Sequence, residues 1–364
     1  MQRIGLGCWI VLCGVISIMA QSSYVTDDDL LAILQDYVVG DEPGAVVFVY
    51  DAGESYSAAF GLADLDSGEP IRSDDLFRIA SISKQMVSAV MLTLVESGQV
   101  GLDDPIADYL PAEIVENVAN ADEATVRQIL QMTSGIADYL ATDGFYDAVY
   151  DTPKYFWTPE ETIAFIYGEA PSFEAGEGYE YSNSNYNLAQ IIIESVTGEP
   201  LADSLSARVF EPLGMESCYL ETADTFAENI VRGYALDEND ELADVTAIND
   251  GVGLGDGGVI CTAEDLAKFP IGLLDGKLIS DDVLAEMLTT VDDGEDGQYG
   301  LGIAYDEDPD YGETVWHDGA TSGFQSILIY LPEAELSVVV LTNNFDAEAV
   351  EDIAYDAIAL AFGE

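Results

Sequence analysis

Basic residues are scarce in this chain of 364 residues. Lysine and arginine together number 10, against 70 aspartate and glutamate residues, which gives a formal net charge of −60 at pH 7. The lysines are Lys84, Lys154, Lys268 and Lys277. Binding of nucleic acid requires clustered basic side chains that neutralise phosphates. The sequence contains no such cluster, so we exclude nucleic acid as a partner.

The composition is nevertheless unlike that of a disordered acidic chain. Hydrophobic residues make up 49% of the sequence and tyrosine occurs 20 times, so the chain can bury a large core. Acidic residues are spread over the whole length, and a surface this negative repels itself unless salt screens it. We therefore expect a folded, halophilic protein adapted to high ionic strength.

Long hydrophobic runs are absent after the first 20 residues. Within these, Arg3 precedes an uncharged apolar run from Ile4 to Met19, and Ala20 offers a cleavage site. This pattern is typical of a signal peptide, which we assign to residues 1–20. Ile18 occupies a position where a small residue is preferred, so an uncleaved N-terminal anchor is the alternative. We expect a secreted or periplasmic protein, with no stable membrane insertion after signal removal.

Cysteine and histidine are rare as well. Cys8 and Cys13 belong to the signal peptide, which leaves Cys218 and Cys261. An even number of cysteines in an exported protein permits a disulfide, although two buried free thiols fit equally. The single histidine, His317, is remote in sequence from both cysteines. We therefore expect no metal site and no cofactor.

Strand patterns occur near both ends of the chain, around a mostly helical middle. Their hairpin-like spacing, without crossover helices, indicates an antiparallel sheet. The predicted strands are residues 44–50, 55–60, 301–305, 314–317, 325–330 and 336–341. The predicted helices include residues 158–167, 187–197 and 346–362.

We therefore predict an α/β fold of the α+β kind, in which helices flank an antiparallel sheet built from both chain ends. After the signal peptide, residues 24–364 form one domain. Residues 24–78 and about 282–364 supply the sheet region, and about 79–281 form an inserted, mostly helical region. Clefts usually form where two such regions meet, so we expect the active site at this junction.

A serine and a lysine stand three residues apart at the start of the helical region. Ser81-Ile82-Ser83-Lys84 precedes an apolar stripe at helical spacing, so Ser81 lies at or just before the first turn of a helix. Free backbone N–H groups at a helix start favour a developing anion. Lys84 faces the same site, where desolvation makes a lysine a possible base for a serine hydroxyl. The simpler interpretation is a serine helix cap with an exposed lysine.

Two further segments carry side chains suited to the same chemistry. Tyr181 stands two residues before Asn183. A tyrosine acts as a base only beside a cation such as Lys84, and the Asn183 amide can orient a lysine or a substrate amide. His317 follows a predicted strand, and Gly319 would let a substrate lie against that strand.

The motifs Ser-x-x-Lys, Tyr-x-Asn and His-x-Gly, in this order, resemble those of the serine β-lactamase and penicillin-binding-protein superfamily. The chain is most similar to the branch of class C β-lactamases, DD-carboxypeptidases, D-aminopeptidases and related esterases. The resemblance extends from about residue 43 to residue 362. It includes residues 60–64, 102–105, 127–135, 212–215, 262–266 and 299–302.

The resemblance implies an acyl-enzyme mechanism in which each motif residue has a role. Ser81 would be the acylated nucleophile, with Lys84 and Tyr181 as the proton-transfer pair. His317 would take the place of the lysine of the third motif. On the substrate side, the resemblance implies that Asn183 binds the substrate amide.

The strand after His317 would complete the substrate site. The backbone N–H groups of Ser81 and Ala320 would form the oxyanion hole, and Gly319 would admit the substrate. Asp318 stands where a residue such as threonine often contacts the substrate carboxylate. If its side chain faces the pocket it would repel carboxylate-bearing substrates, whereas strand alternation would turn it away from His317.

Two other departures from the family pattern concern single residues. Met132 stands where a histidine is usual before Thr-Ser-Gly, and we interpret it as structural. A histidine at position 317 points away from typical class C β-lactamases and toward the peptidase and esterase members.

We predict an exported serine hydrolase of the DD-peptidase, D-aminopeptidase or esterase type, acting on a small molecule or peptide through an acyl-enzyme. The alternatives are a class C-like β-lactamase and a non-catalytic, penicillin-recognising binding protein with the same fold. The intact set of Ser81, Lys84, Tyr181 and His317 disfavours the binding protein, since a binder need not keep all four. Fold alone does not decide between substrates.

Overall fold

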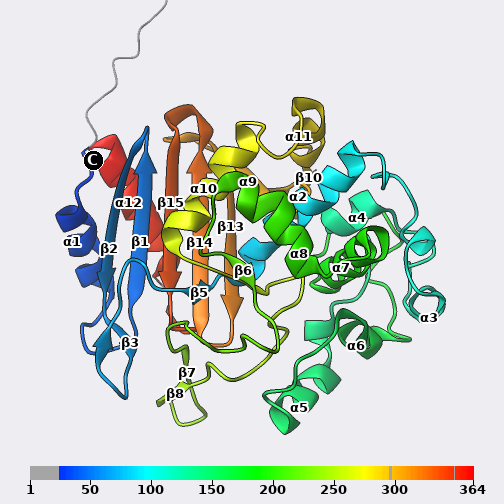
Figure 1. Cartoon of the computed structure of the whole chain (residues 1–364), viewed down its shortest axis with the longest axis horizontal. Helices are drawn as coiled ribbons and strands as arrows, with labels where there is room; N and C mark the ends of the chain where they lie inside the picture. Colours follow the sequence, from blue (N-terminus) through cyan, green and yellow to red (C-terminus); the bar gives the residue numbers. More distant parts are fainter. Residues whose placement is uncertain (1–23, 295–296, 348) are drawn as a thin grey trace, which may run out of the picture.

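The computed structural model describes residues 24–294, 297–347 and 349–364. The predicted signal peptide, residues 1–20, lies outside this part of the chain. No helix of the described part is both long and apolar enough to cross a lipid bilayer. A large sheet stands beside a mostly helical region, and the first and last helices of the described chain, residues 27–37 and 350–362, lie together at the sheet end (Figure 1).

The large sheet is antiparallel and draws its strands from both ends of the chain, which confirms the predicted fold class. Among the described residues it has eight strands in the order β10-β11-β12-β13-β14-β15-β1-β2. β1 lies between its hairpin partner β2 and the last strand β15, with Val46 opposite Leu341. The strands are β10 (Val291–Asp292), β11 (Gln298–Tyr299), β12 (Ala304–Asp308), β13 (Gly312–Thr321), β14 (Phe324–Leu331), β15 (Leu336–Thr342), β1 (Ala45–Asp51) and β2 (Glu54–Phe60).

Helices surround this sheet and fill the inserted region. Side-chain caps fix the N-terminal ends of several helices. At the start of α6, for example, Thr158 and Glu161 form a reciprocal capping box. The helices are α1 (Asp27–Tyr37), α2 (Ser83–Glu96), α3 (Ala112–Asn117), α4 (Val126–Leu130), α5 (Asp143–Asp151), α6 (Pro159–Ile163), α7 (Ser184–Thr197), α8 (Leu201–Leu205), α9 (Glu211–Leu213), α10 (Ala263–Leu274), α11 (Asp281–Met287) and α12 (Val350–Phe362).

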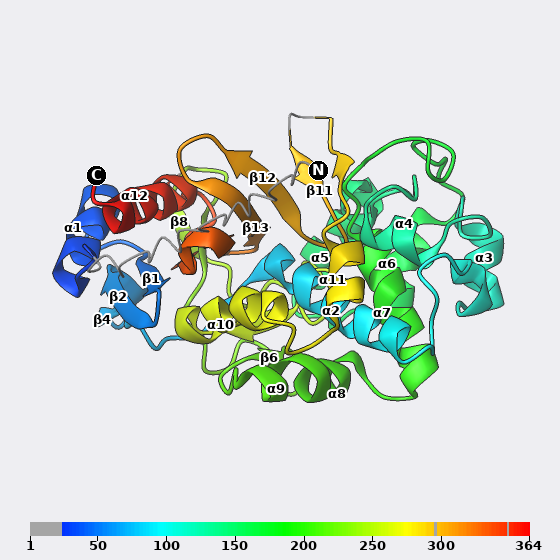
Figure 2. The same ribbon diagram turned by 90° about the horizontal axis from the view of Figure 1, so that it is seen from above.

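β1 shows how the sheet is buried on both faces, because successive side chains of a strand point to opposite sides. Val46 and Phe48 join the core that continues into the helical region, and α10 packs over this face. Val47 and Val49 join a second core with α1 and α12 on the other face. The helices α10 and α12 therefore cover opposite sides of the sheet (Figure 2).

Short strands connect the sheet to the helical region. They are β3 (Leu62–Asp64), β4 (Glu69–Pro70), β5 (Phe77–Arg78), β6 (Tyr219–Leu220), β7 (Tyr234–Leu236), β8 (Leu242–Asp244) and β9 (Val259–Cys261). A disulfide joins Cys218 to Cys261 at the paired strands β6 and β9. Arg78 forms a fully buried ion pair with Glu221 at 2.9 Å, which ties β5 to the segment after β6.

Two predicted elements begin several residues later than expected. The chain turns before β12 instead of forming a strand from residue 301, because Gly302 adopts φ +81°. Leu301 and Ile303 are buried by this turn, which explains their apolar character. The final helix begins at Val350 and not at Asp346, whose carboxylate instead accepts a hydrogen bond from the Leu236 N–H at 2.7 Å.

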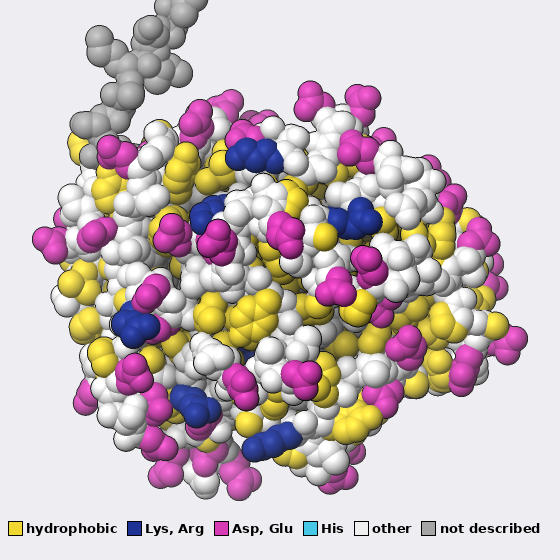
Figure 3. Space-filling view, in the orientation of Figure 1, with side chains coloured by type: hydrophobic (Ala, Val, Ile, Leu, Met, Phe, Trp, Pro, Cys, Tyr) yellow, Lys and Arg dark blue, Asp and Glu magenta, His cyan; other side chains and the backbone are white. Residues whose placement is uncertain are grey.

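The acidic composition is visible on the surface. On the face in Figure 3, acidic side chains are spread over all the elements, and the basic side chains stand apart from one another. Four of the described basic residues, Arg72, Arg127, Lys268 and Lys277, are paired with nearby carboxylates.

Candidate active site

Ser81 lies in the 3₁₀ helix η1 (Ala80–Ile82), directly before α2. Ala80 adopts φ +46°, a strained conformation for a residue with a side chain. Two contacts hold this turn in place: the Ile79 N–H donates to the Val259 carbonyl at 3.0 Å, and the Ser326 hydroxyl donates to the Ile79 carbonyl at 2.8 Å. The Ser81 hydroxyl is thereby fixed where the sheet meets the helical region.

Lys84 lies on the first turn of α2 and is fully buried. Its Nζ contacts three oxygens: Ser81 Oγ at 2.8 Å, Asn183 Oδ1 at 2.9 Å and the Asp256 carbonyl at 2.6 Å. The Asn183 and Asp256 oxygens can only accept, so in the neutral amine they take its two N–H groups and leave the lone pair for the Ser81 hydroxyl, whereas in the ammonium form Nζ also donates to Ser81 Oγ. Burial lowers the pKa of Lys84 to about 8, so the neutral base is accessible near neutral pH.

Asp138 orients Asn183, and the sequence analysis did not single it out. Its Oδ2 accepts from the Asn183 side-chain NH₂ at 3.0 Å, and its Oδ1 accepts from the Asn183 backbone N–H at 3.2 Å. The carboxylate can only receive the NH₂ end of the amide, so Asn183 Oδ1 is left for Lys84. Burial raises the pKa of Asp138, and the hydrogen bonds from Asn183 oppose that shift.

Met132 packs against the Tyr-x-Asn segment and is hydrogen-bonded to it through its sulfur. Its sulfur accepts hydrogen bonds from the Ser182 backbone N–H and the Asn185 side-chain amide, both at 3.4 Å. The side chain is fully buried, and the backbone adopts φ +61°. These contacts are structural ones, made to the residues on either side of Asn183.

The Tyr181 ring lies beside the lysine, with its centroid 4.9 Å from Lys84 Nζ, and its hydroxyl is hydrogen-bonded with Ser81. Burial raises the pKa of Tyr181 well above its ordinary value, while the hydrogen bond with Ser81 opposes this. Tyr181 is therefore a neutral phenol in this state. It is suited to passing on a proton and not to acting as a resting phenolate.

The two ring nitrogens of His317 have different partners. Nδ1 lies 2.6 Å from the Asp318 carbonyl, and Nε2 lies 3.1 Å from the hydroxyl of Tyr299, on β11. A carbonyl can only accept, so Nδ1 carries the proton and Nε2 accepts from Tyr299. Burial lowers the pKa of His317 to about 4, so the ring is neutral at pH 7. His317 thus stands in the third motif without the positive charge that a lysine would bring.

One edge of β13 passes the nucleophile. β12 pairs with β13 only as far as Trp316, and residues 317–321 lie against η1. The Trp316 carbonyl points to this edge, where it accepts from Gln85 Nε2 at 3.2 Å. Backbone groups alternate in direction along a strand, so Ala320 directs its N–H to the same edge.

Gly319 lets β13 come this close. A Cβ added at Gly319 would lie 2.6 Å from the Ile79 carbonyl oxygen and 2.8 Å from the Ser81 nitrogen. The Ser81 nitrogen therefore lies close to β13 beside Ala320, where the expected oxyanion hole requires both backbone N–H groups.

Asp318 lies at the mouth of the site. Its side chain is 71% exposed, whereas that of His317 is 4% exposed, as strand alternation predicts. Its Oδ1 remains 3.8 Å from His317 Nδ1, and its charge raises the pKa of Lys84 against the larger effect of burial. The side chain is therefore close enough to influence the site but projects into solvent.

Asp256 is a second residue that the sequence analysis missed. Its carboxylate lies within the protein, with the residue 5% exposed, and Oδ2 accepts from the Tyr139 hydroxyl at 2.7 Å. Burial raises the pKa of Asp256 to about 6, while the charge of Lys84 opposes the shift. It belongs to a glycine-rich loop, residues 251–258, with no spacing relation to Ser81 or Lys84 that a sequence motif would reveal.

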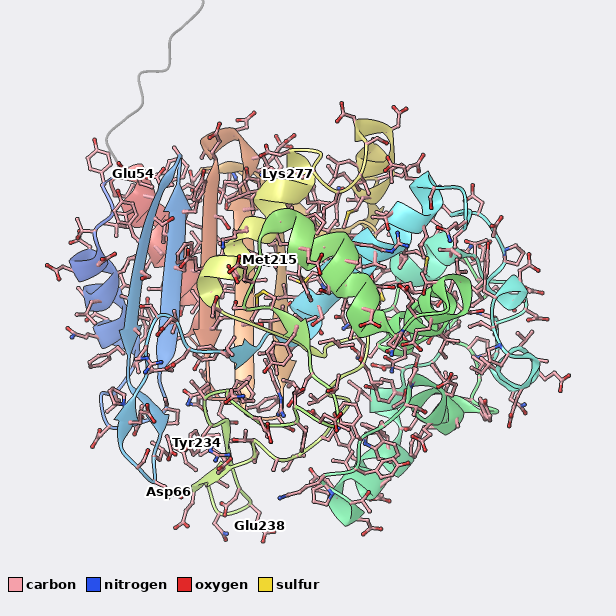
Figure 4. All side chains as sticks on the ribbon, viewed as in Figure 1. Glu54, Asp66, Met215, Tyr234, Glu238 and Lys277 are labelled. Carbon is pink, nitrogen blue, oxygen red and sulfur yellow. A yellow bond between two sulfur atoms is a disulfide. The ribbon has the colours of Figure 1, made fainter. Side chains whose placement is uncertain are left out.

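A cavity of about 810 Å³ opens over Ser81 and Asn183. Apolar side chains that are partly exposed form part of its wall: Tyr146 and Tyr150 from α5, and Leu236 from β7. The β7–β8 hairpin borders it, with Glu238 at the hairpin tip (Figure 4).

The charged residues of the cavity wall are all acidic. Among the described residues that line it there is no lysine, arginine or histidine. The acidic ones are Asp237, Glu238, Asp250, Asp256 and Asp346. No group of three or more histidine, cysteine, aspartate or glutamate side chains in the described chain is arranged to hold a metal ion.

Comparison with solved structures defines the class of protein. The structure of a D-stereospecific amidohydrolase from Streptomyces sp. is similar to this one with a TM-score of 0.78 and 27% sequence identity, over 92% of this chain and 99% of the other. The chain is a β-lactamase-related serine hydrolase. Residues 31–362 match the Beta-lactamase family, and the chain belongs to that family.

Two relatives extend this comparison. Penicillin-binding protein 4* of Bacillus subtilis is 28% identical over 326 residues, which cover 85% of this chain and 70% of the relative. A D-aminopeptidase of Brucella anthropi is 30% identical over 327 residues, which cover 88% of this chain and 59% of the relative. The chain thus spans little more than half the length of the D-aminopeptidase.

Proposed function

We propose that this chain hydrolyses D-aminoacyl amides or short D-peptides with a free amino group, through an acyl-enzyme on Ser81. The observation that carries the proposal is the contact of Lys84 Nζ with Ser81 Oγ at 2.8 Å, with both other Nζ contacts made to oxygens that only accept. This geometry supports Lys84 as the base that removes the Ser81 proton.

The remaining residues fit the following steps. Ser81 Oγ attacks the substrate carbonyl as its proton passes to Lys84, and the N–H groups of Ser81 and Ala320 stabilise the negative oxygen. Tyr181 relays a proton from the Lys84 ammonium to the leaving amine, which departs as the acyl-enzyme forms. Water then attacks the ester carbon as one of its protons passes to Lys84, and that proton returns to Ser81 Oγ as the bond to the acyl carbon breaks and the acid leaves. Asn183 orients Lys84 and offers its amide to the substrate.

The charge of the cavity supports a substrate with a free ammonium group. Carboxylates line the cavity wall and no basic side chain of the described chain does, so a cationic acyl group is favoured and a carboxylate is disfavoured. D-Ala-D-Ala peptides and β-lactams both carry a carboxylate. The likeness to a D-aminopeptidase and a D-stereospecific amidohydrolase supports the same preference.

A short-chain ester is the second candidate substrate. The acyl chain of such an ester can pack against exposed apolar side chains of the cavity, those of Tyr146, Tyr150 and Leu236. A neutral ester also needs no charged partner. The class C-like β-lactamase and the penicillin-recognising binding protein remain the alternatives that the experiment must separate.

The test is a substrate panel at molar salt. It contains D-phenylalanine p-nitroanilide, its N-acetyl derivative, a short-chain p-nitrophenyl ester, a D-Ala-D-Ala peptide and a cephalosporin, with intact-mass detection of the adduct and Ser81→Ala as control. We expect the free-amino anilide to have the highest kcat/KM and the adduct to map to Ser81. Preference for the cephalosporin would support a β-lactamase, and a stable penicillin adduct without any turnover would support a binding protein.

We also propose that the chain is exported and adapted to salt. The apolar run after Arg3 and the Cys218–Cys261 disulfide support export. Expression of the full chain in a secreting host, followed by N-terminal sequencing, tests this: a mature protein that begins at Gln21 is expected. A secreted or membrane-bound product that begins at Met1 would favour the uncleaved anchor.

A further inference from the structure

We propose that Asp256 is a positioning residue that stabilises the protonated form of Lys84 while Ser81 is acylated. The proposal rests on the proposed chemistry at Ser81 and gives a role to a buried carboxylate that this chemistry does not otherwise use. Asp256 acts through Lys84 and need not touch the substrate.

Asp256 presents two different groups to the site. Its backbone carbonyl accepts from Lys84 Nζ at 2.6 Å, while its carboxylate turns to the Tyr139 hydroxyl. The loop that carries it has little room to move. A Cβ at Gly255 would lie 2.7 Å from the Tyr186 carbonyl oxygen, and a Cβ at Gly258 would lie 2.6 Å from the Gly253 backbone. The packed loop thus fixes the carboxylate toward Tyr139, while the backbone carbonyl of the same residue contacts Lys84 Nζ.

The carboxylate is only partly satisfied by hydrogen bonds. Oδ2 receives the Tyr139 hydroxyl, but Oδ1 is buried and has no hydrogen-bond partner among the described residues. A buried charge in this condition is costly unless a nearby cation compensates for it. The nearby cation is Lys84. Its charge lowers the pKa of Asp256, while burial raises that pKa by more. By reciprocity, the Asp256 carboxylate favours the ammonium form of Lys84.

Acylation needs this stabilisation at one step. As the bond from Ser81 Oγ to the substrate carbon forms, the hydroxyl proton passes to Lys84 Nζ, and the lysine gains a positive charge inside the protein. Desolvation opposes a charge there. The Asp256 carboxylate is in place before the reaction and offsets that penalty in the transition state. A buried aspartate stabilises the protonated histidine of a Ser-His-Asp triad on the same principle.

The other charged and titratable groups near Lys84 are differently placed. Asp138 and Asp318 also raise its pKa, but Asp138 is bonded to Asn183 and Asp318 is 71% exposed. His317 is neutral at pH 7. The rings of Tyr181 and Tyr186 face Nζ, at 4.9 Å and 5.8 Å from centroid to nitrogen. Asp256 is therefore a buried residue in contact with Lys84 whose carboxylate is not hydrogen-bonded to any residue of the three motifs.

The test is the Asp256→Asn variant, which keeps the side-chain shape, an acceptor for Tyr139 and the backbone carbonyl. The rate of labelling of Ser81 by a serine-directed phosphonate is measured against pH, together with kcat/KM for the best substrate of the panel. Loss of the negative charge lowers the pKa of Lys84, so the acidic limb of both profiles moves down by about one pH unit or more. The plateau of kcat/KM falls about tenfold or more, because the transition-state cation loses its counter-charge.

Salt provides a matched control. The limb shift in Asp256→Asn persists in molar salt, since the missing charge is buried, whereas a limb shift in Asp318→Asn disappears because that charge is exposed and screened. Tyr139→Phe is a second variant that leaves residue 256 in place. It removes the hydrogen bond from the carboxylate, raises the pKa of Asp256 and moves the limb in the same direction by less.

The outcomes are distinguishable. A limb that stays at the wild-type pH in Asp256→Asn overturns the role of Asp256, even if the plateau falls, because a purely structural role would lower the plateau alone. If the limb moves but the free-amino anilide is not hydrolysed, the role stands and the proposed substrate class is wrong. If the phosphonate does not label Ser81 in the wild type, both proposals are wrong.

Discussion

Substitution of Gly319 by alanine tests whether the close approach of β13 builds the oxyanion hole. The added Cβ would lie 2.6 Å from the Ile79 carbonyl oxygen, 2.8 Å from Ser326 Oγ and 2.8 Å from the Ser81 nitrogen. The backbone of Gly319 does not have a positive φ, so the cost arises from lack of space alone. Overpacking of this kind typically costs about 1–3 kcal/mol of the free energy of unfolding.

The catalytic loss should exceed the loss of stability. The clash pushes the Ser81 N–H and the strand apart, and removal of one oxyanion donor typically lowers kcat about 10²- to 10³-fold. We expect kcat to fall by about 10²-fold with little change in KM, because the donor acts on the transition state. The measurements are steady-state kinetics on the best substrate of the panel and urea denaturation at molar salt.

Gly257→Ala is the matched control for this experiment. Gly257 also packs against η1, where an added Cβ would meet Ala80 atoms at 3.6 to 3.8 Å, an ordinary contact distance. Its φ is also compatible with a side chain, so alanine should stabilise the protein by about 0.4–1 kcal/mol. Wild-type kcat in Gly319→Ala would refute the reasoning, and equal destabilisation by both variants would show that space at η1 is not what distinguishes them.

Three further predictions concern the base, a buried ion pair and salt. Lys84→Ala and Tyr181→Phe should each lower kcat by orders of magnitude, and the double variant should be scarcely worse than either; additive losses would indicate independent roles. Arg78→Met should lower the free energy of unfolding by about 3–5 kcal/mol in chemical denaturation, because it leaves Glu221 buried and unpaired; Arg78→Met with Glu221→Leu should recover part of the loss, and no recovery would contradict this. The acidic surface raises the pKa of Lys84, so the acidic limb of kcat/KM should move to lower pH as added salt shortens the screening length from about 10 Å at 0.1 M to about 3 Å at 1 M. Circular dichroism confirms that the protein is folded at both salt concentrations. If the acidic limb then stays in place, the surface charge affects only solubility and stability.

The sequence predicts the fold well wherever local patterns decide it. The β1–β2 hairpin follows from two apolar runs on either side of Ala52-Gly53, which both adopt positive φ at the turn. Hairpin spacing at both ends of the chain predicts that the sheet is antiparallel, whereas the pairing of β1 with β15 joins segments far apart in sequence. By contrast, the apolar run at residues 301–305 predicted a strand, because a buried turn and a buried strand have the same composition.

The site is predictable only as far as its residues belong to motifs. Ser81 and Lys84 stand one helical turn apart, so local spacing alone brings them together. Asp256 reaches Lys84 and Asp138 reaches Asn183 from separate loops, and Tyr299 reaches His317 from another strand. No periodicity links these residues to the motifs, since tertiary contacts alone bring them together. Their burial, which shifts the pKa values in the site, is likewise a property of the folded chain.

The position of β1 between β2 and β15 has a consequence for folding. Val46 pairs with Leu341, so the centre of the sheet closes only when segments nearly 300 residues apart meet, as the 295-residue separation of this pair shows. Such non-local pairing slows folding, because the entropy of a long loop is lost before the contact forms. A chain that ends before β15 would leave β1 and β14 with unpaired, valine- and isoleucine-rich edges. Truncated products of this protein should therefore aggregate and not fold into a smaller stable domain.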